Sequence, residues 1–155
     1  DEVTRDYVTV FFDHGAAPKA ASYEYTVLPD ADAEATAAYA ADPQIVVSDN
    51  TADVHAVTGP GVLAANFWNP GTAAGTLTAD AASSVCLAEA DGTVTIAVAD
   101  PKQSDATITI TLARTVSEVV EADGNVTVTI DGDTAKITVD SAGKAGLPSQ
   151  AVLAV

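Results

Sequence analysis

Apolar and polar residues alternate along most of this chain, and that alternation predicts β-strands. The most regular runs are TVTIAVAD (residues 93–100), ATITITLA (106–113), NVTVTID (125–131) and AKITVD (135–140). In each run the Val, Ile and Leu side chains fall on one face of an extended chain, as in a half-buried strand. We therefore expect these four segments to form part of one buried core.

Shorter apolar runs predict further strands earlier in the chain. They are VTRDYVTVFF (3–12), ASYEYTVL (21–28), QIVVSD (44–49), DVHAVTG (53–59), VLAANFW (62–68) and SSVCLAEA (83–90). DHGAAPKA lies between the first two runs, and its Gly15 and Pro18 favour a turn. The segment NPGTAAGT (69–76) is predicted to be a loop.

Asp-Gly pairs separate the later runs and predict tight hairpins. Asp91-Gly92 joins two strand-like runs and has the composition that type I′ turns favour. Asp123-Gly124 and Asp131-Gly132-Asp133 are predicted to be further turns. Strands of this length at intervals of about 10 residues indicate an antiparallel β-sandwich. The fold class that we predict is all-β, with one short helix.

That helix is predicted in the alanine-rich segment between Pro29 and Pro43. Asp30 or Asp32 can cap its first turn, where acidic side chains also complement the helix dipole. Pro43 ends the segment, and the composition changes there. We place a domain boundary at this point, between residues 1–43 and residues 44–155.

The charge balance excludes one class of partner. The chain has 22 acidic residues against 6 Lys and Arg, a net charge of −16. The cations are scattered, at Arg5, Lys19, Lys102, Arg114, Lys136 and Lys144. No basic stripe exists to neutralise phosphates, so we expect no nucleic-acid binding. A solvated acidic surface that aids solubility is the plainest interpretation.

The apolar runs, the single cysteine and the N-terminal residue add little to the predicted fold and function. No run approaches the roughly 18 apolar residues of a membrane span, and no signal peptide is present, so no membrane partner is expected. Cys86 is alone, which excludes an internal disulfide, and we expect it to be a buried, inert thiol. No cofactor is expected. The chain begins with Asp and contains no Met, which indicates a mature product or a fragment.

The N-terminal third resembles a known enzyme family. YVTVFFDHGAAPKAASYEYTVLPDADAEATAAYA (7–40) is similar to the end of the central β supersandwich of polysaccharide lyase family 8. The following QIVVSDNTADVHAVTGPGVLAANFW (44–68) resembles the opening of that family's C-terminal β domain. The resemblance implies that residues 1–43 end the supersandwich and that residues 44–155 form the C-terminal sandwich.

The same resemblance implies a function for the parent protein. Members of this family, which includes hyaluronate, chondroitin AC and xanthan lyases, are secreted bacterial enzymes that cut uronic-acid polysaccharides by β-elimination. Their catalytic residues lie on an N-terminal α/α toroid and in earlier strands of the central sheet. No family catalytic residue carries over to this chain, which we therefore expect to be inactive alone. Its expected partner is the catalytic segment, which binds the glycosaminoglycan substrate.

Asp13 and His14 form the candidate catalytic pair in this chain. With Tyr7, Tyr23 and Arg5 they supply the residue types that proton abstraction beside a carboxylate requires. A net charge of −16 opposes a polyanionic substrate, however. We expect Asp13 and His14 to form a strand corner by bonding to backbone or to a neighbouring domain.

Three residues are weaker candidates for ligand contact. Asn66 and Trp68 offer an amide and an aromatic ring, which suit hydrogen bonding and stacking on sugars. Packing or a domain interface explains the same residues. His55 is expected to be partly buried and hydrogen-bonded rather than a metal ligand.

Two acidic motifs resemble parts of calcium loops, DADAE (30–34) and DGD (131–133). Neither continues into the twelve-residue pattern of ligands, so capping and turns explain both, and no metal is expected.

Two functions of different classes remain open at this point. The first is the C-terminal scaffold and docking part of a secreted hyaluronan- or chondroitin-type lyase. The second is a stand-alone carbohydrate-binding or cell-surface β module without catalysis.

Overall fold

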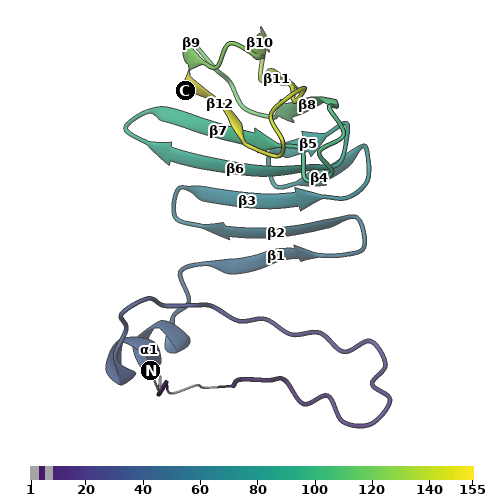
Figure 1. Ribbon diagram of the computed structural model, residues 1–155. Coiled ribbons are helices and arrows are strands. Elements are labelled where there is room, and N and C mark those ends of the chain that lie inside the picture. Colours follow the sequence, from purple (N-terminus) through teal and green to yellow (C-terminus); the bar gives the residue numbers. More distant parts are fainter. Residues whose placement is uncertain (1–3, 6–8) are drawn as a thin grey trace.

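Two antiparallel β-sheets form the body of the protein (Figure 1). The structure is a computed structural model, and it describes residues 4–5 and 9–155. The seven-stranded sheet has the order β1-β2-β3-β6-β7-β12-β9, and the five-stranded sheet has the order β10-β11-β8-β5-β4. With the single helix α1 (Ala33–Ala41), this arrangement confirms the predicted all-β sandwich.

The strands follow the sequence closely from residue 46 onward. Their bounds are β1 Val46–Asn50, β2 Val54–Gly59, β3 Val62–Phe67, β4 Thr72–Ala74, β5 Leu77–Ala79, β6 Ser83–Ala90, β7 Thr93–Ala99, β8 Thr107–Leu112, β9 Glu118–Ala122, β10 Val126–Asp131, β11 Thr134–Asp140 and β12 Ser149–Ala154.

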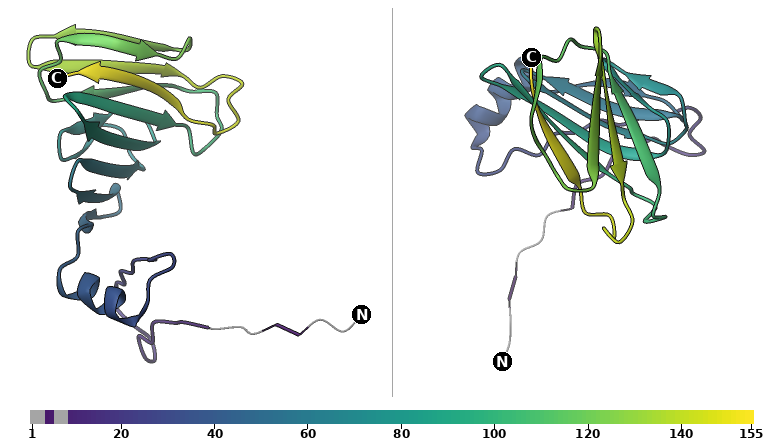
Figure 2. Two further views of the ribbon diagram at one scale, coloured as in Figure 1. Left: turned by 90° about the vertical axis from the view of Figure 1, so that its left-hand side faces the viewer. Right: turned by 90° about the horizontal axis from the view of Figure 1, so that it is seen from above.

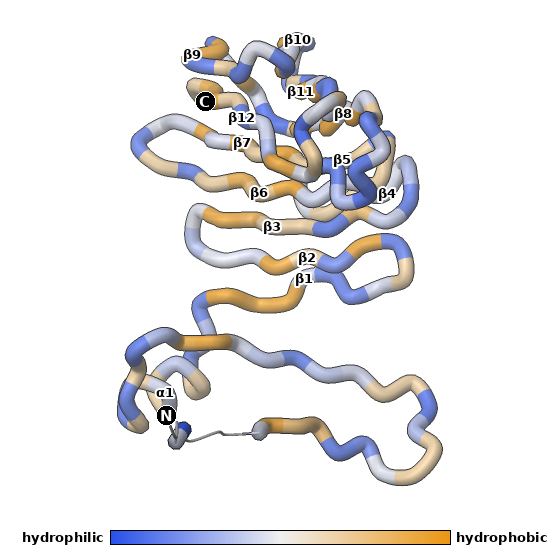
Figure 3. The backbone as a smooth tube through the Cα atoms, viewed as in Figure 1, coloured by the Kyte–Doolittle hydropathy of each residue, from blue (hydrophilic) through white to orange (hydrophobic). Residues whose placement is uncertain are grey.

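The core lies between the two sheets and is built from alternate residues of their strands. Its largest fully buried side chains are Phe67, Leu77, Ile96, Ile108, Ile110, Leu112, Ile137 and Leu153. They include the Ile and Leu residues that the period-two pattern of the sequence places on one face, except Ile130 of β10, which is 39% exposed, so the expectation of a buried face is wrong at this position. Figure 3 shows the corresponding apolar stretches along the strands, with polar residues concentrated in the connections.

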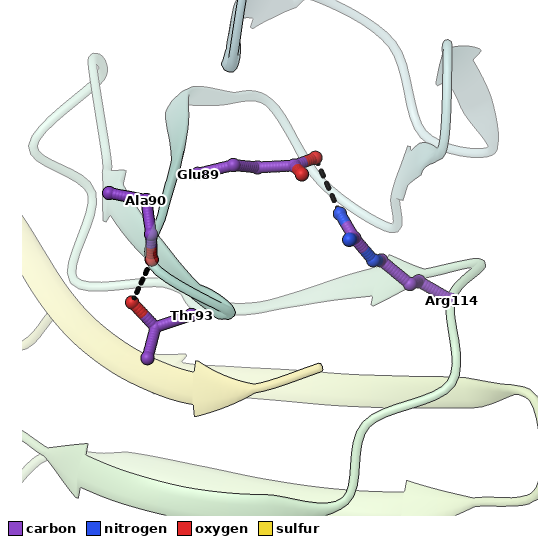
Figure 4. A network of polar contacts seen from close by, with 4 residues as sticks. All are labelled: Glu89, Ala90, Thr93 and Arg114. Atoms are coloured by element: carbon purple, nitrogen blue, oxygen red, sulfur yellow. Dashed lines mark hydrogen bonds and ion pairs between the residues drawn. The ribbon is translucent and has the colours of Figure 1, made fainter.

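The Asp91-Gly92 turn forms as predicted. Ala90 of β6 pairs with Thr93 of β7, so the connection is two residues long. Asp91 and Gly92 have φ values of 49° and 77°, the left-handed pair that a type I′ turn requires. The Thr93 hydroxyl donates to the Ala90 carbonyl at 2.8 Å and closes the turn (Figure 4).

An ion pair joins the two sheets near this hairpin. Arg114, which follows β8, lies 2.5 Å from the Glu89 carboxylate of β6 (Figure 4). Both side chains are about one-third or more exposed, at 34% and 41%, so solvent screens the pair. Its contribution to stability is correspondingly small, about 0.2–1 kcal/mol.

The predicted loop at residues 69–76 is partly wrong. It contains the short strand β4, which pairs with β5 and completes the five-stranded sheet. Strands β5, β9 and β12 also lie outside the runs that we singled out. Alanine fills many of their positions, and β9 is exposed along its whole length, so their alternation is weak.

The helix is confirmed. Asp32 is its N-cap, and the carboxylate of this residue accepts a hydrogen bond from the Ala35 backbone N–H at 2.8 Å. The Thr36 hydroxyl donates to the Asp32 carbonyl at 2.7 Å. Asp32 therefore has the capping role that we assigned to this acidic motif.

The two predicted N-terminal strands do not form within the described residues. Residues 9–28 run as two arms joined by a turn, without assigned strand, outside the sandwich and beyond β1 (Figures 1 and 2). Aromatic rings join the arms, since the Phe12 and Tyr23 centroids lie 5.2 Å apart. No backbone hydrogen bond links the arms in this described segment, and a strand requires such a ladder. Residues 3 and 6–8 of the first prediction lie outside the described residues.

Candidate functional site

A row of polar side chains crosses one face of the seven-stranded sheet. The register pairs Asn50 with His55, His55 with Asn66, and Asn66 with Ser84. Residues paired across strands project from the same face, and neighbouring strands are about 4.8 Å apart. We call Asn50, His55, Asn66 and Ser84 the polar row. It lies on the outer face, because the flanking residues of these strands point into the core.

An open hollow of about 610 Å³ follows the polar row. Its other side is lined by a parallel row of small apolar residues, Val57, Ala64, Cys86 and Ala97. Cys86 is exposed, so the prediction of a buried thiol is wrong. Val85 and Leu87 occupy the core positions on either side of it, and the period of two turns Cys86 outward.

Asn66 is held by its neighbour in the row. The Ser84 hydroxyl donates to Asn66 Oδ1 at 2.6 Å. The Asn66 Nδ2 group has no hydrogen-bond partner in the described part of the chain, and Asn66 lines the hollow. The amide is therefore oriented and still has both of its donors free.

His55 differs from our expectation. It is exposed, and its ring nitrogens make no hydrogen bond to the described residues. Val54 and Ala56 take the buried positions of β2, which leaves His55 on the outer face. The imidazole instead packs edge-to-face against Trp68, with the ring centroids 5.7 Å apart and an interplanar angle of 80°.

Trp68 is anchored at the end of the polar row. Its backbone N–H donates to the Asp53 carbonyl at 2.8 Å. The neighbouring Asn69 Nδ2 donates to the Asp53 carboxylate at 2.5 Å. The Trp68 side chain remains 40% exposed. The structure thus brings Asn66 and Trp68, the two predicted glycan-contact residues, to the two sides of His55.

A smaller hollow of about 260 Å³ adjoins the indole ring. The residues that line it include Trp68, Asn69, Asp100, Lys102 and Ser104. Sequence reasoning missed His55 and Lys102 as neighbours of Trp68, and Ser84 as the neighbour of Asn66. The outward positions of His55 and Ser84 could be read from the alternation, but their pairing depends on strand register.

Asp100 is a structural carboxylate. Burial acts to raise the pKa of this group, but hydrogen bonds from Ser104 and Lys102 outweigh it and lower the pKa to about 2. The Lys102 backbone N–H donates at 2.8 Å, and the Ser104 N–H and hydroxyl donate at 2.7 and 2.9 Å. These donors, with the Ser141 hydroxyl at 3.3 Å, occupy the carboxylate. Asp100 therefore holds the loop after β7 and is not a candidate base.

The candidate catalytic residues are not assembled into a site. Asp13 accepts a hydrogen bond from the Gly15 N–H at 2.8 Å and so stabilises the turn between the two arms, although the arms on either side of it are not the strands that we predicted. His14 is exposed, and neither His14, Tyr23 nor Arg5 lines either hollow. Tyr7 lies outside the described residues.

The described part of the chain contains neither a cluster of side chains suited to a metal ion nor a helix that could span a membrane. Residues 4–5 and 9–155 hold no cluster of three or more His, Cys, Asp or Glu side chains suited to a metal. Over the same residues, the single helix is too short to cross a membrane. Asp131-Gly132-Asp133 forms the turn between β10 and β11.

Comparisons with known proteins point to one family. Residues 46–109 match the C-terminal beta-sandwich domain of polysaccharide lyase family 8, and residues 1–40 match the super-sandwich domain of the same family. A hyaluronate lyase of Thermasporomyces composti is 42% identical over 158 residues, which is 100% of this chain and 20% of that protein. A xanthan lyase of Bacillus sp. strain GL1 is 41% identical over 93% of this chain and 16% of its own length.

Solved structures of chondroitin and xanthan lyases superpose on this chain. The Streptomyces coelicolor chondroitin AC lyase in complex with chondroitin sulphate superposes with a TM-score of 0.82 at 33% identity, over 92% of this chain and 19% of that one. A Paenibacillus xanthan lyase superposes with a TM-score of 0.77 at 30% identity, over 83% of this chain and 13% of that one. The chain thus spans about a fifth or less of these relatives. It belongs to polysaccharide lyase family 8, and it corresponds to the C-terminal region of the family's hyaluronate, chondroitin and xanthan lyases.

Proposed function

We propose that this chain is the C-terminal β part of a secreted bacterial lyase that degrades hyaluronan- or chondroitin-type polysaccharides. In this proposal it supplies a scaffold and a docking surface, while a catalytic α/α toroid on another segment carries out β-elimination. The relatives support the reaction class, since they are hyaluronate, xanthan and chondroitin lyases. We further propose that residues 1–43 end the supersandwich domain and that residues 44–155 form the C-terminal domain.

The exposed arms at residues 9–28 carry the docking proposal. Phe11, Tyr25 and Val27 are 77%, 67% and 72% exposed, although all three are large and apolar. Within the part of the chain that the structure describes, the backbone N–H and C=O groups of both arms also form no ladder. Apolar groups that gather on one exposed segment are typical of an interaction surface, and free backbone groups can add to a sheet edge. We infer that the arms complete a sheet of the supersandwich domain.

The described residues offer no set that could carry out β-elimination. That reaction needs a base for the C5 proton, a group that neutralises the adjacent carboxylate, and an acid for the leaving oxygen. His14, Tyr23 and Arg5 are exposed and lie outside both hollows. A net charge of −16 also repels a uronic-acid polymer.

Ultraviolet absorbance of the unsaturated uronide product tests this division of labour. The purified 155-residue chain is incubated with hyaluronan and with chondroitin sulfate, alone and with the separately produced N-terminal segment of the enzyme. We expect no product from the chain alone and a stable complex with the N-terminal segment. Product released by the chain alone would show that the scaffold interpretation is wrong.

Substitutions in the arms test docking separately. Phe11→Asp or Tyr25→Asp places a carboxylate in the proposed contact, which costs free energy when the charge is buried unpaired. We expect each variant to weaken the complex by at least about tenfold, that is 1.4 kcal/mol, with an unchanged melting temperature of the sandwich. Thr129→Asp, on the exposed face of β10, is the matched control and should leave the complex intact.

A stand-alone carbohydrate-binding or cell-surface module is the second candidate. The exposed Trp68 beside Asn66 favours it. The sequence upstream of residue 1 separates the two functions, because a helical toroid supports the lyase part and a signal peptide directly before Asp1 supports the module.

A further inference from the structure

Trp68 presents its indole ring to solvent in a fixed position. The ring packs against the His55 imidazole in a T-shaped arrangement, and the backbone is fixed through the hydrogen bonds of Trp68 and Asn69 to Asp53. An exposed aromatic ring that is already ordered loses little conformational entropy when a ligand covers it. Trp68 is thus preorganised as a flat apolar platform.

Groups that can form hydrogen bonds line the two hollows near this platform. On the side of the large hollow, Asn66 has a free amide N–H₂ and His55 has ring nitrogens without partners among the described residues. On the side of the small hollow lie Lys102 and Ser104. Sites for small ligands combine an apolar surface with a few oriented polar groups in this way.

The chemistry of the face selects among ligand classes. A hexose ring has one face of C–H groups, which packs on an aromatic ring, and a rim of hydroxyls, which bond to amide and imidazole groups. A peptide strand would need a free sheet edge, whereas the polar row lies on a sheet face whose backbone is already paired. A large apolar partner would bury the polar row without hydrogen bonds, which is costly.

The charge of the molecule favours a neutral sugar over an anionic one as the ligand. Lys102 is the single cation in the lining of either hollow, and the molecule as a whole has a net charge of −16. An anionic sugar therefore meets long-range repulsion that a neutral sugar does not. We propose that Trp68, His55 and Asn66 form an accessory binding site for a neutral hexose or N-acetylhexosamine residue of a glycan. This site is independent of the scaffold role proposed above.

The single tryptophan of the chain gives a direct reporter. The 155-residue protein is titrated with three neutral tetrasaccharides, cellotetraose, chitotetraose and mannotetraose, and with a hyaluronan octasaccharide, while Trp fluorescence is followed. We expect a saturable change with at least one neutral sugar, and the same affinity in low and in high salt. Hyaluronan should bind more weakly, and its affinity should rise with added salt as the repulsion is screened.

Variants assign the binding to this face. Calorimetry should show a loss of affinity of at least about tenfold, that is 1.4 kcal/mol, for Trp68→Ala and for Asn66→Ala. Trp68→Phe, which keeps a ring, should bind within about threefold of wild type, and Thr129→Ala, on the other sheet, should bind as wild type. Circular dichroism confirms that each variant is folded.

Three results would overturn the proposal. They are no saturable signal with any neutral tetrasaccharide, wild-type affinity in both Trp68→Ala and Asn66→Ala, and tighter hyaluronan binding that salt weakens. The last result would assign the site to an anionic sugar held by Lys102. Each is distinguishable from failure of the scaffold proposal, which is read from complex formation with the N-terminal segment.

Discussion

At the scale of single residues, Asp100 has the most demanding environment. Its carboxylate accepts three hydrogen bonds, from the Lys102 N–H, the Ser104 N–H and the Ser104 hydroxyl. The Ser141 hydroxyl lies 3.3 Å from the same carboxylate and 2.8 Å from the Ala106 carbonyl, so its single proton is shared at most between the two. Ser141 follows β11, so this cluster links the loop after β7 of one sheet to the end of a strand of the other. If Asp100 were replaced by Asn, some of these N–H and O–H donors would face an amide N–H₂ group, which cannot accept a hydrogen bond.

Asp100→Asn is therefore expected to lower the free energy of unfolding by about 1–3 kcal/mol, the cost of buried donors left without acceptors. Urea denaturation at neutral pH measures it. Asp91→Asn is the matched control, because Asn suits the type I′ turn as well as Asp does and should leave stability unchanged. Equal midpoints for wild type and Asp100→Asn would contradict this account of the carboxylate.

The same residue predicts a pH dependence. Its pKa falls from 3.8 to about 2 on folding, so the folded state favours the charged form. The stability that this shift provides is complete above the unfolded pKa and is lost as the pH falls toward the folded pKa. Wild type and Asp100→Asn should converge in thermal stability between about pH 4 and pH 2. A gap that stays constant over this range would exclude the mechanism.

Among the elements, the β6–β7 hairpin depends most directly on one glycine. Gly92 has a φ of +77°, and a Cβ atom added there would meet nothing within 4 Å. Gly92→Ala therefore introduces backbone strain without a clash, and it should cost about 1–2 kcal/mol. Gly124 is also unobstructed but lies outside the left-handed region, so Gly124→Ala is the control. Thermal melts that show equal losses would contradict the turn assignment.

The elements also show what the sequence could predict. The runs at 93–100, 106–113, 125–131 and 135–140 alternate strictly, and each contains a strand whose apolar face is buried or partly buried. Strand β9 (Glu118–Ala122) lies at a sheet edge and is exposed throughout. It therefore needs no apolar face, and its sequence does not alternate between apolar and polar residues. The arms at residues 9–28 show the reverse case, because they alternate like strands but form no ladder with any of the described residues.

To predict the candidate site from the sequence, one would need to know the register of the strands as well as their positions. Asn66 and Trp68 can be nominated from residue type alone. Their association with His55 and Ser84 follows from the pairing of β2, β3 and β6, and a shift by one residue would send these side chains to the core. Local pattern does not determine that register.

For the whole molecule, charge is the dominant property. A net charge of −16 destabilises the compact state by self-repulsion, which salt screens. The melting temperature should rise when NaCl is increased from about 10 mM to about 150 mM, where the Debye length falls to about 8 Å. The single ion pair of the described residues, Glu89 with Arg114, is too exposed to reverse this trend. A melting temperature that falls with added NaCl would contradict the conclusion that charge repulsion destabilises the fold. Sodium sulfate at matched ionic strength is the control for effects specific to chloride.

We propose that residues 9–28 dock into the rest of a larger lyase, and amide hydrogen exchange measures this docking. The chain is measured alone and in the whole enzyme, with the β6–β7 hairpin as an internal reference that is protected in both. Apart from Gly15, whose N–H is bonded to Asp13, we predict rapid exchange of residues 9–28 in the isolated chain, where no backbone–backbone hydrogen bond to the described residues holds them, and strong protection in the enzyme. Equal, rapid exchange of these amides in both samples would contradict the account.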